Sequence, residues 1–180
     1  FATDIRVRAH SYHPDGVKLE STEISEGVVY DKGGVKLTAF KVDHGGEALD
    51  AFGYRIDFDG RSAVLSGDTT FNENVIKFGT GADLLVHEVV HGMDMNADTK
   101  NIERITRNHT TAERAGEVFA RARPKLAAYT HLLLFGNATA DELIPATRAT
   151  YDGPLVVGED LMRFDITDEV IVTPFEEEQA

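Results

Sequence analysis

The sequence of 180 residues contains no cysteine, no sustained basic run and no long apolar stretch. The absence of cysteine excludes disulfides, thiolate metal ligands and a cysteine nucleophile, so a bound metal would need His, Asp or Glu ligands. No apolar run approaches the roughly 18 residues of a membrane span, which argues against a membrane partner. The first ten residues also lack the apolar core of a signal peptide, and the compartment is left open.

Positive charge is also scarce, because 18 Lys and Arg face 31 Asp and Glu, for a formal net charge of −13. Such a chain repels a phosphate backbone, which argues against nucleic acid as a general partner, although a local basic stripe remains compatible with it. The length and the 42% hydrophobic content fit one globular domain, or part of one, across residues 1–180. Residues 175–180 form an acidic tail, and no internal repeat or linker is evident.

The hydrophobic pattern changes in character along the chain. In the first part, period-two alternation and turn dipeptides predict strands at residues 5–9, 17–24, 27–30, 35–42, 52–58 and 61–65. The second part predicts helices at 72–78, 110–121 and 139–149, and strands at 83–87, 125–130, 155–157, 162–166 and 170–172. A meander followed by alternating helices and strands predicts an α/β layered fold, with helices on one face of a sheet.

Side chains that can bind metal recur where the predicted strands end, at His44, Asp68, His87, Glu88 and His131. Strand ends in layered α/β folds are common ligand sites, because the rigid sheet fixes side chains that the loops surround. Neutral imidazoles and a carboxylate suit zinc, and one carboxylate can bridge two ions. Each residue alone also fits an ordinary loop or capping role, so their joint placement carries the prediction.

Residues 87–91 read His-Glu-Val-Val-His and match H-E-x-x-H, the zinc peptidase pattern. This zincin interpretation requires a helix that places His87 and His91 on one face with Glu88 as base. The preceding Asp-Leu-Leu-Val reads as a buried strand, two valines follow, and Gly92 interrupts the next turn. The zinc peptidase is therefore kept as an alternative to the interpretation in which a buried strand ends at His87.

Five blocks resemble a known family. They are Phe-Gly-Tyr-Arg-Ile at 52–56, Ser-Gly-Asp-Thr at 66–69, Asp-Leu-Leu-Val-His-Glu at 83–88, His-Thr-Thr-Ala at 109–112 and Ala-Tyr-Thr-His at 128–131. In this order they are similar to the C-terminal half of the metallo-β-lactamase fold, in the branch of ribonuclease Z and its small-molecule relatives. The resemblance covers about residues 35–166. It implies an αββα sandwich of two similar halves, of which this chain would form the C-terminal half to two-thirds.

The resemblance also implies a binuclear metal site at the edge of both sheets. His44 would be a terminal ligand of the first metal, Asp68 would bridge both metals, and His131 would be a terminal ligand of the second. Zinc is the expected metal, with manganese or iron as alternatives. Glu88 and His109 resemble a pair in which a carboxylate orients an imidazole that protonates the leaving group. On the residues alone, His109 could equally be the residue before a helix cap at Thr110.

The family's N-terminal motif, H-x-H-x-D-H, is absent, and residues 10–15 (His-Ser-Tyr-His-Pro-Asp) have a different spacing and read as an exposed loop. We expect the remaining ligands to come from a missing N-terminal half, on the same or a separate polypeptide. A lone half would expose one sheet face. A homodimer is compatible with such a face.

The sequence favours a metal-dependent hydrolase of a small organic substrate, such as an ester, phosphodiester, sulfate ester or lactone. The short interval between His44 and Asp68 leaves no room for a long tRNA-gripping arm. Leu-Leu-Leu-Phe at 132–135 would form an apolar wall suited to a small hydrophobic molecule. The alternatives are a tRNA 3′-processing endonuclease of the ribonuclease Z type, the zincin peptidase, and a non-catalytic half-domain that binds a partner.

Overall fold

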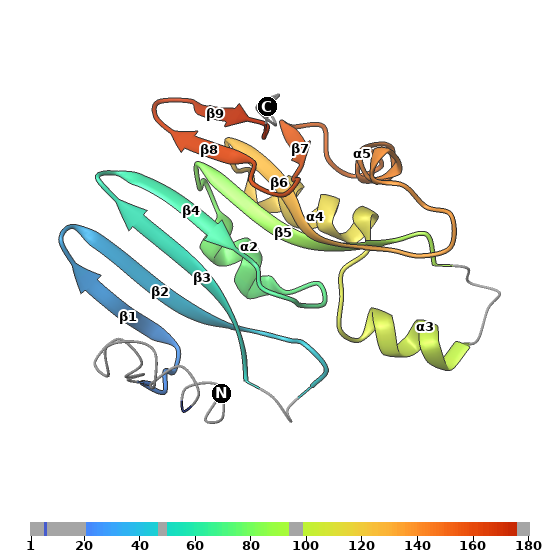
Figure 1. Ribbon diagram of the computed structural model, residues 1–180, viewed down its shortest axis with the longest axis horizontal. Coiled ribbons are helices and arrows are strands. Elements are labelled where there is room, and N and C mark those ends of the chain that lie inside the picture. Colours follow the sequence, from blue (N-terminus) through green and yellow to red (C-terminus); the bar gives the residue numbers. More distant parts are fainter. Residues whose placement is uncertain (1–5, 7–20, 47–49, 94–98, 176–180) are drawn as a thin grey trace.

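The computed structural model describes residue 6 and residues 21–46, 50–93 and 99–175 (Figure 1). Most of the strand predicted at 5–9, the loop at 10–16 and the acidic residues 176–180 lie outside these described residues. None of the described helices is long and apolar enough to span a membrane.

A seven-stranded mixed sheet, with its strands in sequence order from β1 to β7, forms the centre of the molecule (Figure 1). Its strands are β1 (Gly27–Lys32), β2 (Val35–Val42), β3 (Ala51–Phe58), β4 (Arg61–Leu65), β5 (Leu84–His91), β6 (Leu126–Leu134) and β7 (Leu155–Val157). Neighbours from β1 to β4 pair antiparallel, and neighbours from β4 to β7 pair parallel. The carboxyl ends of β2, β4, β5 and β6 therefore meet at one edge of the sheet.

Helices cover one face of this sheet (Figure 1). They are α2 (Glu73–Gly79), α4 (Ala112–Ala122) and α5 (Leu143–Thr147), the last preceded by the 3-10 turn η2 (Ala140–Glu142). A further helix, α3 (Thr99–Thr106), lies beyond the edge where β5 and β6 end, and β8 (Arg163–Ile166) and β9 (Val170–Thr173) form a separate hairpin (Figure 1). The predicted α/β layered arrangement is thus confirmed.

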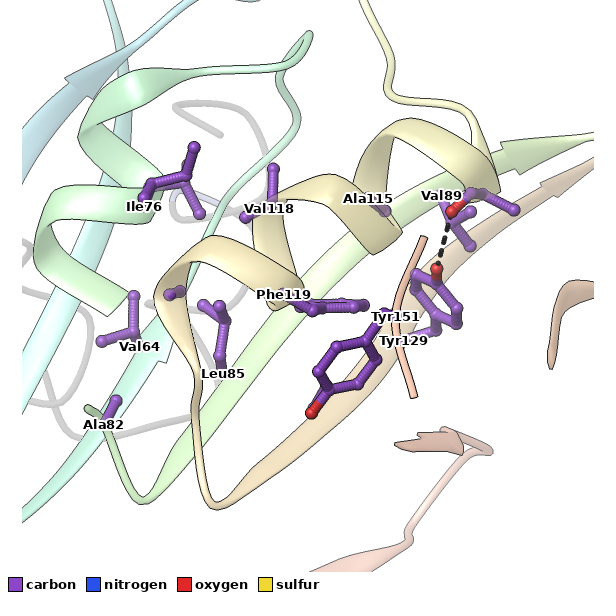
Figure 2. Close-up of a cluster of buried hydrophobic side chains, with 14 of the residues drawn as sticks. Val64, Ile76, Ala82, Leu85, Val89, Ala115, Val118, Phe119, Tyr129 and Tyr151 are labelled. Atoms are coloured by element: carbon purple, nitrogen blue, oxygen red, sulfur yellow. Dashed lines mark hydrogen bonds between the residues drawn. The ribbon is translucent and has the colours of Figure 1, made fainter. Parts of the chain in front are cut away.

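The core lies between the sheet and the helices (Figure 2). Val64, Leu85 and Tyr129 alternate inward from three strands, and they meet Val118 and Phe119 of α4, all at most 1% exposed. Helix α4 presents these residues because its apolar positions recur at helical spacing. The helix begins at the N-cap Thr111, one residue after the predicted cap at Thr110. Thr110 instead donates to Glu88 through its backbone N–H and to the Thr69 carbonyl oxygen through its hydroxyl.

The opposite face carries a row of apolar side chains across five strands. Ala39, Tyr54, Leu65, Val86 and Ala128 are successive cross-strand partners, so their side chains share one face. Leu65 is 40% exposed. Among the residues that the structure describes, no helix packs on this face.

Several element boundaries differ from the predictions. Strand β2 spans the predicted residues, but β5 and β6 continue beyond the predicted ends at residues 87 and 130. Helix α3 was not predicted, because its composition is largely polar. Residues 21–24 have no regular structure, so the described part of the strand predicted at 17–24 is absent.

Substitution of Gly67 by alanine is expected to lower the free energy of unfolding by about 2 kcal/mol or more. Gly67 has φ +63°, and an added Cβ would lie 2.6 Å from the carbonyl oxygen of Phe52. Urea denaturation of the variant tests this, with Gly81→Ala as control. Gly81 has a similar φ of +65° but open space around the Cβ position. Equal losses in both variants would show that the close contact at Gly67 contributes nothing.

Candidate metal centre

Asp68 and His131 approach each other at the sheet edge where the strands end. Asp68 lies three residues after β4, and His131 lies on β6. The distance from His131 Nε2 to Asp68 Oδ2 is 3.3 Å, and their side chains are 46% and 41% exposed. Two donors that face one point and remain accessible can bind a cation.

A bulge in β6 presents His131. Glu88 pairs with Thr130 and Val89 pairs with Leu132, so His131 is an extra residue without a partner on β5. Its φ is +46°, a conformation that residues other than glycine rarely adopt. Bulges and strained backbone often aim side chains at functional sites. The prediction that His131 ends a strand was wrong, because the apolar residues 132–134 continue β6 past the bulge.

His87 lies on β5, beside the bulge in β6. Its Nδ1 donates to the carbonyl oxygen of Glu88, at 2.6 Å, where the register shifts. The imidazole is fully buried and lies edge-to-face against Phe119, with ring centroids 6.0 Å apart. Its Nε2 has no hydrogen-bond partner among the residues that the structure describes. His87 therefore belongs to the helix side of the sheet, away from the edge that carries Asp68.

The zincin interpretation is wrong. Residues 87–91 lie on β5, so the helical face required by H-E-x-x-H does not form. His87 is buried in the core, and His91 Nε2 lies 3.9 Å from the Glu142 carboxylate. The physical reason is that Val89 and Val90 are β-branched and fully buried, and they pair with Leu132 and Leu133 of β6, where such residues pack well.

Glu88 and His109 form a buried pair. Glu88 Oε2 lies 3.2 Å from His109 Nδ1, while its Oε1 accepts a hydrogen bond from the Thr110 backbone N–H at 2.7 Å. The backbone N–H of Glu88 donates to Ser66 Oγ at 3.1 Å, and Ser66 is the first residue after β4. Glu88 is thus held from both sides, and its carboxyl group fixes the orientation of the His109 ring. Like His131, Glu88 lies inside its strand and not at the predicted end.

Burial controls protonation in this pair. It raises the pKa of Glu88 to about 8, and the nearby Asp68 carboxylate adds to the rise. Burial also lowers the pKa of His109, and the neighbouring His44 and His131 contribute to that lowering. At neutral pH the carboxyl group and the imidazole therefore hold one titratable proton between them, the property that a general acid needs.

His44 follows β2 and packs beside His109. Its Nδ1 lies 2.9 Å from the Asn108 carbonyl oxygen and must donate to it, which leaves Nε2 with a lone pair. The ring centroids of His44 and His109 are 5.0 Å apart, and those of His109 and His131 are 5.7 Å apart. His109 thus lies between the two other imidazoles.

These donors fit part of a metal site. A histidine that donates one ring nitrogen to a carbonyl, as His44 does, is the common form of a metal-binding imidazole. Asp68 and His131 add a carboxylate and a second imidazole, which zinc accepts. In the described part of the chain, no three His, Cys, Asp or Glu side chains lie close enough together to hold an ion. The described residues therefore provide an incomplete set of ligands.

Two cavities meet at His109. One, of about 500 Å³, is also lined by Arg107 and Arg114. The other, of about 170 Å³, is lined by Leu133 and Phe135, so part of the predicted apolar wall faces the site. Leu132 and Leu134 instead pack against the core. These arginines were not predicted. Lys100, Arg104 and Arg107 recur at helical spacing, a signal that could have found Arg107.

Comparisons with known proteins identify the family of this chain. Residues 3–132 match the family model described as beta-lactamase superfamily domain. The chain belongs to the beta-lactamase superfamily. The resemblance in the motifs at 52–131 is thereby confirmed, and so is the fold class.

Relatives within the superfamily include two curated proteins named Ribonuclease Z. The one from Mycobacterium marinum is 30% identical over 92% of this chain and 61% of its own length. The one from Haloarcula marismortui is 35% identical over 66% of this chain and 39% of its own length. A solved structure, the metallo-beta-lactamase fold protein YhfI from Bacillus subtilis, aligns with a TM-score of 0.58 at 22% identity, over 72% of this chain and 49% of that one. The chain thus spans about three-fifths or less of the length of each of these three proteins.

The stability of the protein is expected to depend on His87 as the pH falls. Burial lowers the pKa of His87 to about 4, from about 6.5 in the unfolded chain. The unfolded state therefore binds more protons between pH 6.5 and 4, so this stabilisation is complete above pH 6.5 and is lost as the pH falls toward 4. The raised pKa of Glu88 acts in the opposite direction, since its contribution is lost as the pH rises through about 8.

A non-titrating variant separates the two contributions. Urea unfolding at pH 7 and pH 5 should show a change in the free energy of unfolding that differs by about 2 kcal/mol between the wild type and His87→Gln. The Glu88 contribution is common to both proteins and cancels in this comparison. The same pH dependence in both proteins would contradict the assignment.

Proposed function

We propose that this chain forms part of a metal-dependent hydrolase whose substrate is a small organic ester or phosphodiester, sulfate esters and lactones being further members of the same class. The observation that carries the proposal is the buried Glu88–His109 pair beside Asp68 and His131. A carboxylate that orients an imidazole next to a cation-binding edge suits acid-assisted hydrolysis.

Each residue has a distinct role in this proposal. His44 and His131 would be terminal ligands of two divalent ions, most simply zinc, and Asp68 would bridge them. The remaining donors would come from other polypeptide, of the same chain or a separate one. When bound, two such ions polarise the scissile group and lower the pKa of a water molecule.

His109 would deliver a proton to the departing oxygen. Its Nδ1 faces Glu88, so Nε2 is the nitrogen left for the substrate. At neutral pH the acidic proton of the pair rests on Glu88, whose pKa is raised while that of His109 is lowered. Glu88 would pass this proton to Nδ1 of His109 as Nε2 gives its own proton to the leaving oxygen, and the pair would regain a proton from water before the next turnover. Leu133 and Phe135 would contact an apolar leaving group in the smaller cavity next to His109.

A second candidate is tRNA 3′ processing, which the names of the curated relatives favour. The net charge of −13 and the short connection from β2 to β3 argue against it, because RNA affinity depends on basic contacts to phosphates. A partner-binding half-domain without activity remains the non-enzymatic alternative.

Hydrolysis assays on the full-length protein test the proposal. Bis(p-nitrophenyl) phosphate, p-nitrophenyl acetate and a precursor tRNA with a 3′ trailer would be compared after loading with zinc or manganese. We expect a small substrate to be turned over with a higher kcat/KM than the tRNA, with loss on chelation and recovery on metal addition. Cleavage of the tRNA alone would favour the second candidate, and the absence of chelator-sensitive hydrolysis would favour the partner-binding module.

A further inference from the structure

The larger cavity beside His109 is basic, in a chain that is otherwise strongly acidic. Its lining includes Arg107 and Arg114 together with the hydroxyl-bearing Thr70, Thr106 and Thr111. Its volume of about 500 Å³ fits a small ligand. Guanidinium groups and hydroxyls are the donors with which proteins bind phosphate.

Arg107 is available to a ligand. Its side chain is exposed, and in the described part of the chain no carboxylate lies within ion-pair distance of its guanidinium group. It also lines an adjoining cavity of about 270 Å³ with Lys100, Arg104 and the acidic Glu103. Three cationic side chains thus gather on and just after α3, next to the proposed active site. The acidic residue in the larger cavity, Asp43, accepts a hydrogen bond from the Gly46 backbone N–H.

Arg114 is held in position from two sides. Its guanidinium carbon lies 4.0 Å from the centre of the Phe71 ring, within the range of a cation–π interaction. Its Nη1 contacts Glu117 Oε2 at 3.1 Å, an exposed pair that fixes the side chain more than it neutralises it. A guanidinium group that is ordered before binding loses less entropy when a ligand arrives.

We propose that this cavity binds a phosphate monoester group that the substrate carries in addition to the bond that is cleaved, with Arg107 and Arg114 as its donors. This inference rests on the proposed function and narrows its substrate class. His109 lines the basic cavity and the apolar one with Leu133 and Phe135. The preferred substrate is therefore an ester or phosphodiester with an apolar leaving group on one side and a phosphate on the other.

A pair of chromogenic substrates tests the proposal. Thymidine 5′-(p-nitrophenyl phosphate) would be compared with the same compound carrying a 3′-phosphate, using the full-length metal-loaded protein. Arg107→Gln should raise KM for the 3′-phosphorylated substrate about tenfold, since a charge-assisted hydrogen bond to phosphate is lost. Its kcat, and KM for the substrate without the 3′-phosphate, should stay within about twofold.

Arg163→Gln is the matched control, because Arg163 is also exposed but lies on β8, outside this cavity. Binding of thymidine 3′,5′-bisphosphate in the presence of a chelator, measured by calorimetry, provides a readout without catalysis. The dissociation constant should rise about tenfold in Arg107→Gln and stay unchanged in Arg163→Gln. Equal binding by both variants would overturn the subsite. Arginine-dependent binding without any hydrolysis by the wild type would support the subsite and refute the proposed function.

Discussion

Replacement of Asp68 by alanine is expected to abolish metal-dependent hydrolysis, with a loss of at least about 10³-fold in kcat/KM. In the proposed site, Asp68 would supply a carboxylate oxygen to each of the two ions, and its Oδ2 lies 3.3 Å from His131 Nε2. Its removal should also reduce bound metal below two equivalents. Mass spectrometry for metal content and steady-state kinetics measure the two effects on the same preparation.

The folded state should survive this substitution, because the Asp68 side chain is 41% exposed and lies outside the core. Asp160→Ala is a suitable control, since Asp160 is an exposed carboxylate in the turn before β8. Unchanged metal content and an unchanged rate in Asp68→Ala would contradict the proposed bridging role of Asp68. Loss of activity in both variants would instead indicate a general effect of the lost charge.

Glu88→Gln is expected to lower kcat by roughly 10² to 10⁴-fold while metal content and KM remain close to those of the wild type. Glutamine keeps an oxygen that can accept from Thr110, but it cannot share a proton with His109. Glutamine is preferred to alanine because the Glu88 side chain is 1% exposed, and alanine would leave the Thr110 N–H unsatisfied.

The pH dependence of kcat distinguishes a role of Glu88 in proton transfer from a purely structural role. The limb of the kcat profile that reports the Glu88–His109 proton should be lost in Glu88→Gln and in His109→Ala. The double variant should be no slower than the slower single variant, since the two groups act as one unit. Additive losses would show that the carboxyl group and the imidazole act separately.

Local signals in the sequence predicted the scaffold of this site. The Gly33–Gly34 turn, with φ of +62° and +82°, joins β1 and β2 as the turn dipeptide indicated, and β2 has the predicted bounds. His44 and Asp68 follow their strands as predicted. Such features depend on neighbours within a few residues, which is why a single sequence is sufficient to find them.

Features that depend on contacts between distant parts of the chain could not be predicted from these local signals. The bulge at His131 depends on pairing with β5, forty residues earlier in the chain, and no pattern within β6 announces it. Pairing with β6 makes residues 87–91 a strand, against a motif that is typical of a helix. The Arg107–Arg114 cavity depends on how α3 is placed beyond the sheet, and α3 itself has too little apolar surface to be recognised readily.

The most direct test of the account is anomalous X-ray scattering from crystals of the zinc-loaded full-length protein. The account predicts two peaks with the Asp68 carboxylate between them, His44 on one and His131 on the other, and further donors from outside the described residues. A single peak elsewhere, or two peaks that Asp68 does not contact, would contradict the binuclear site and the hydrolase built on it.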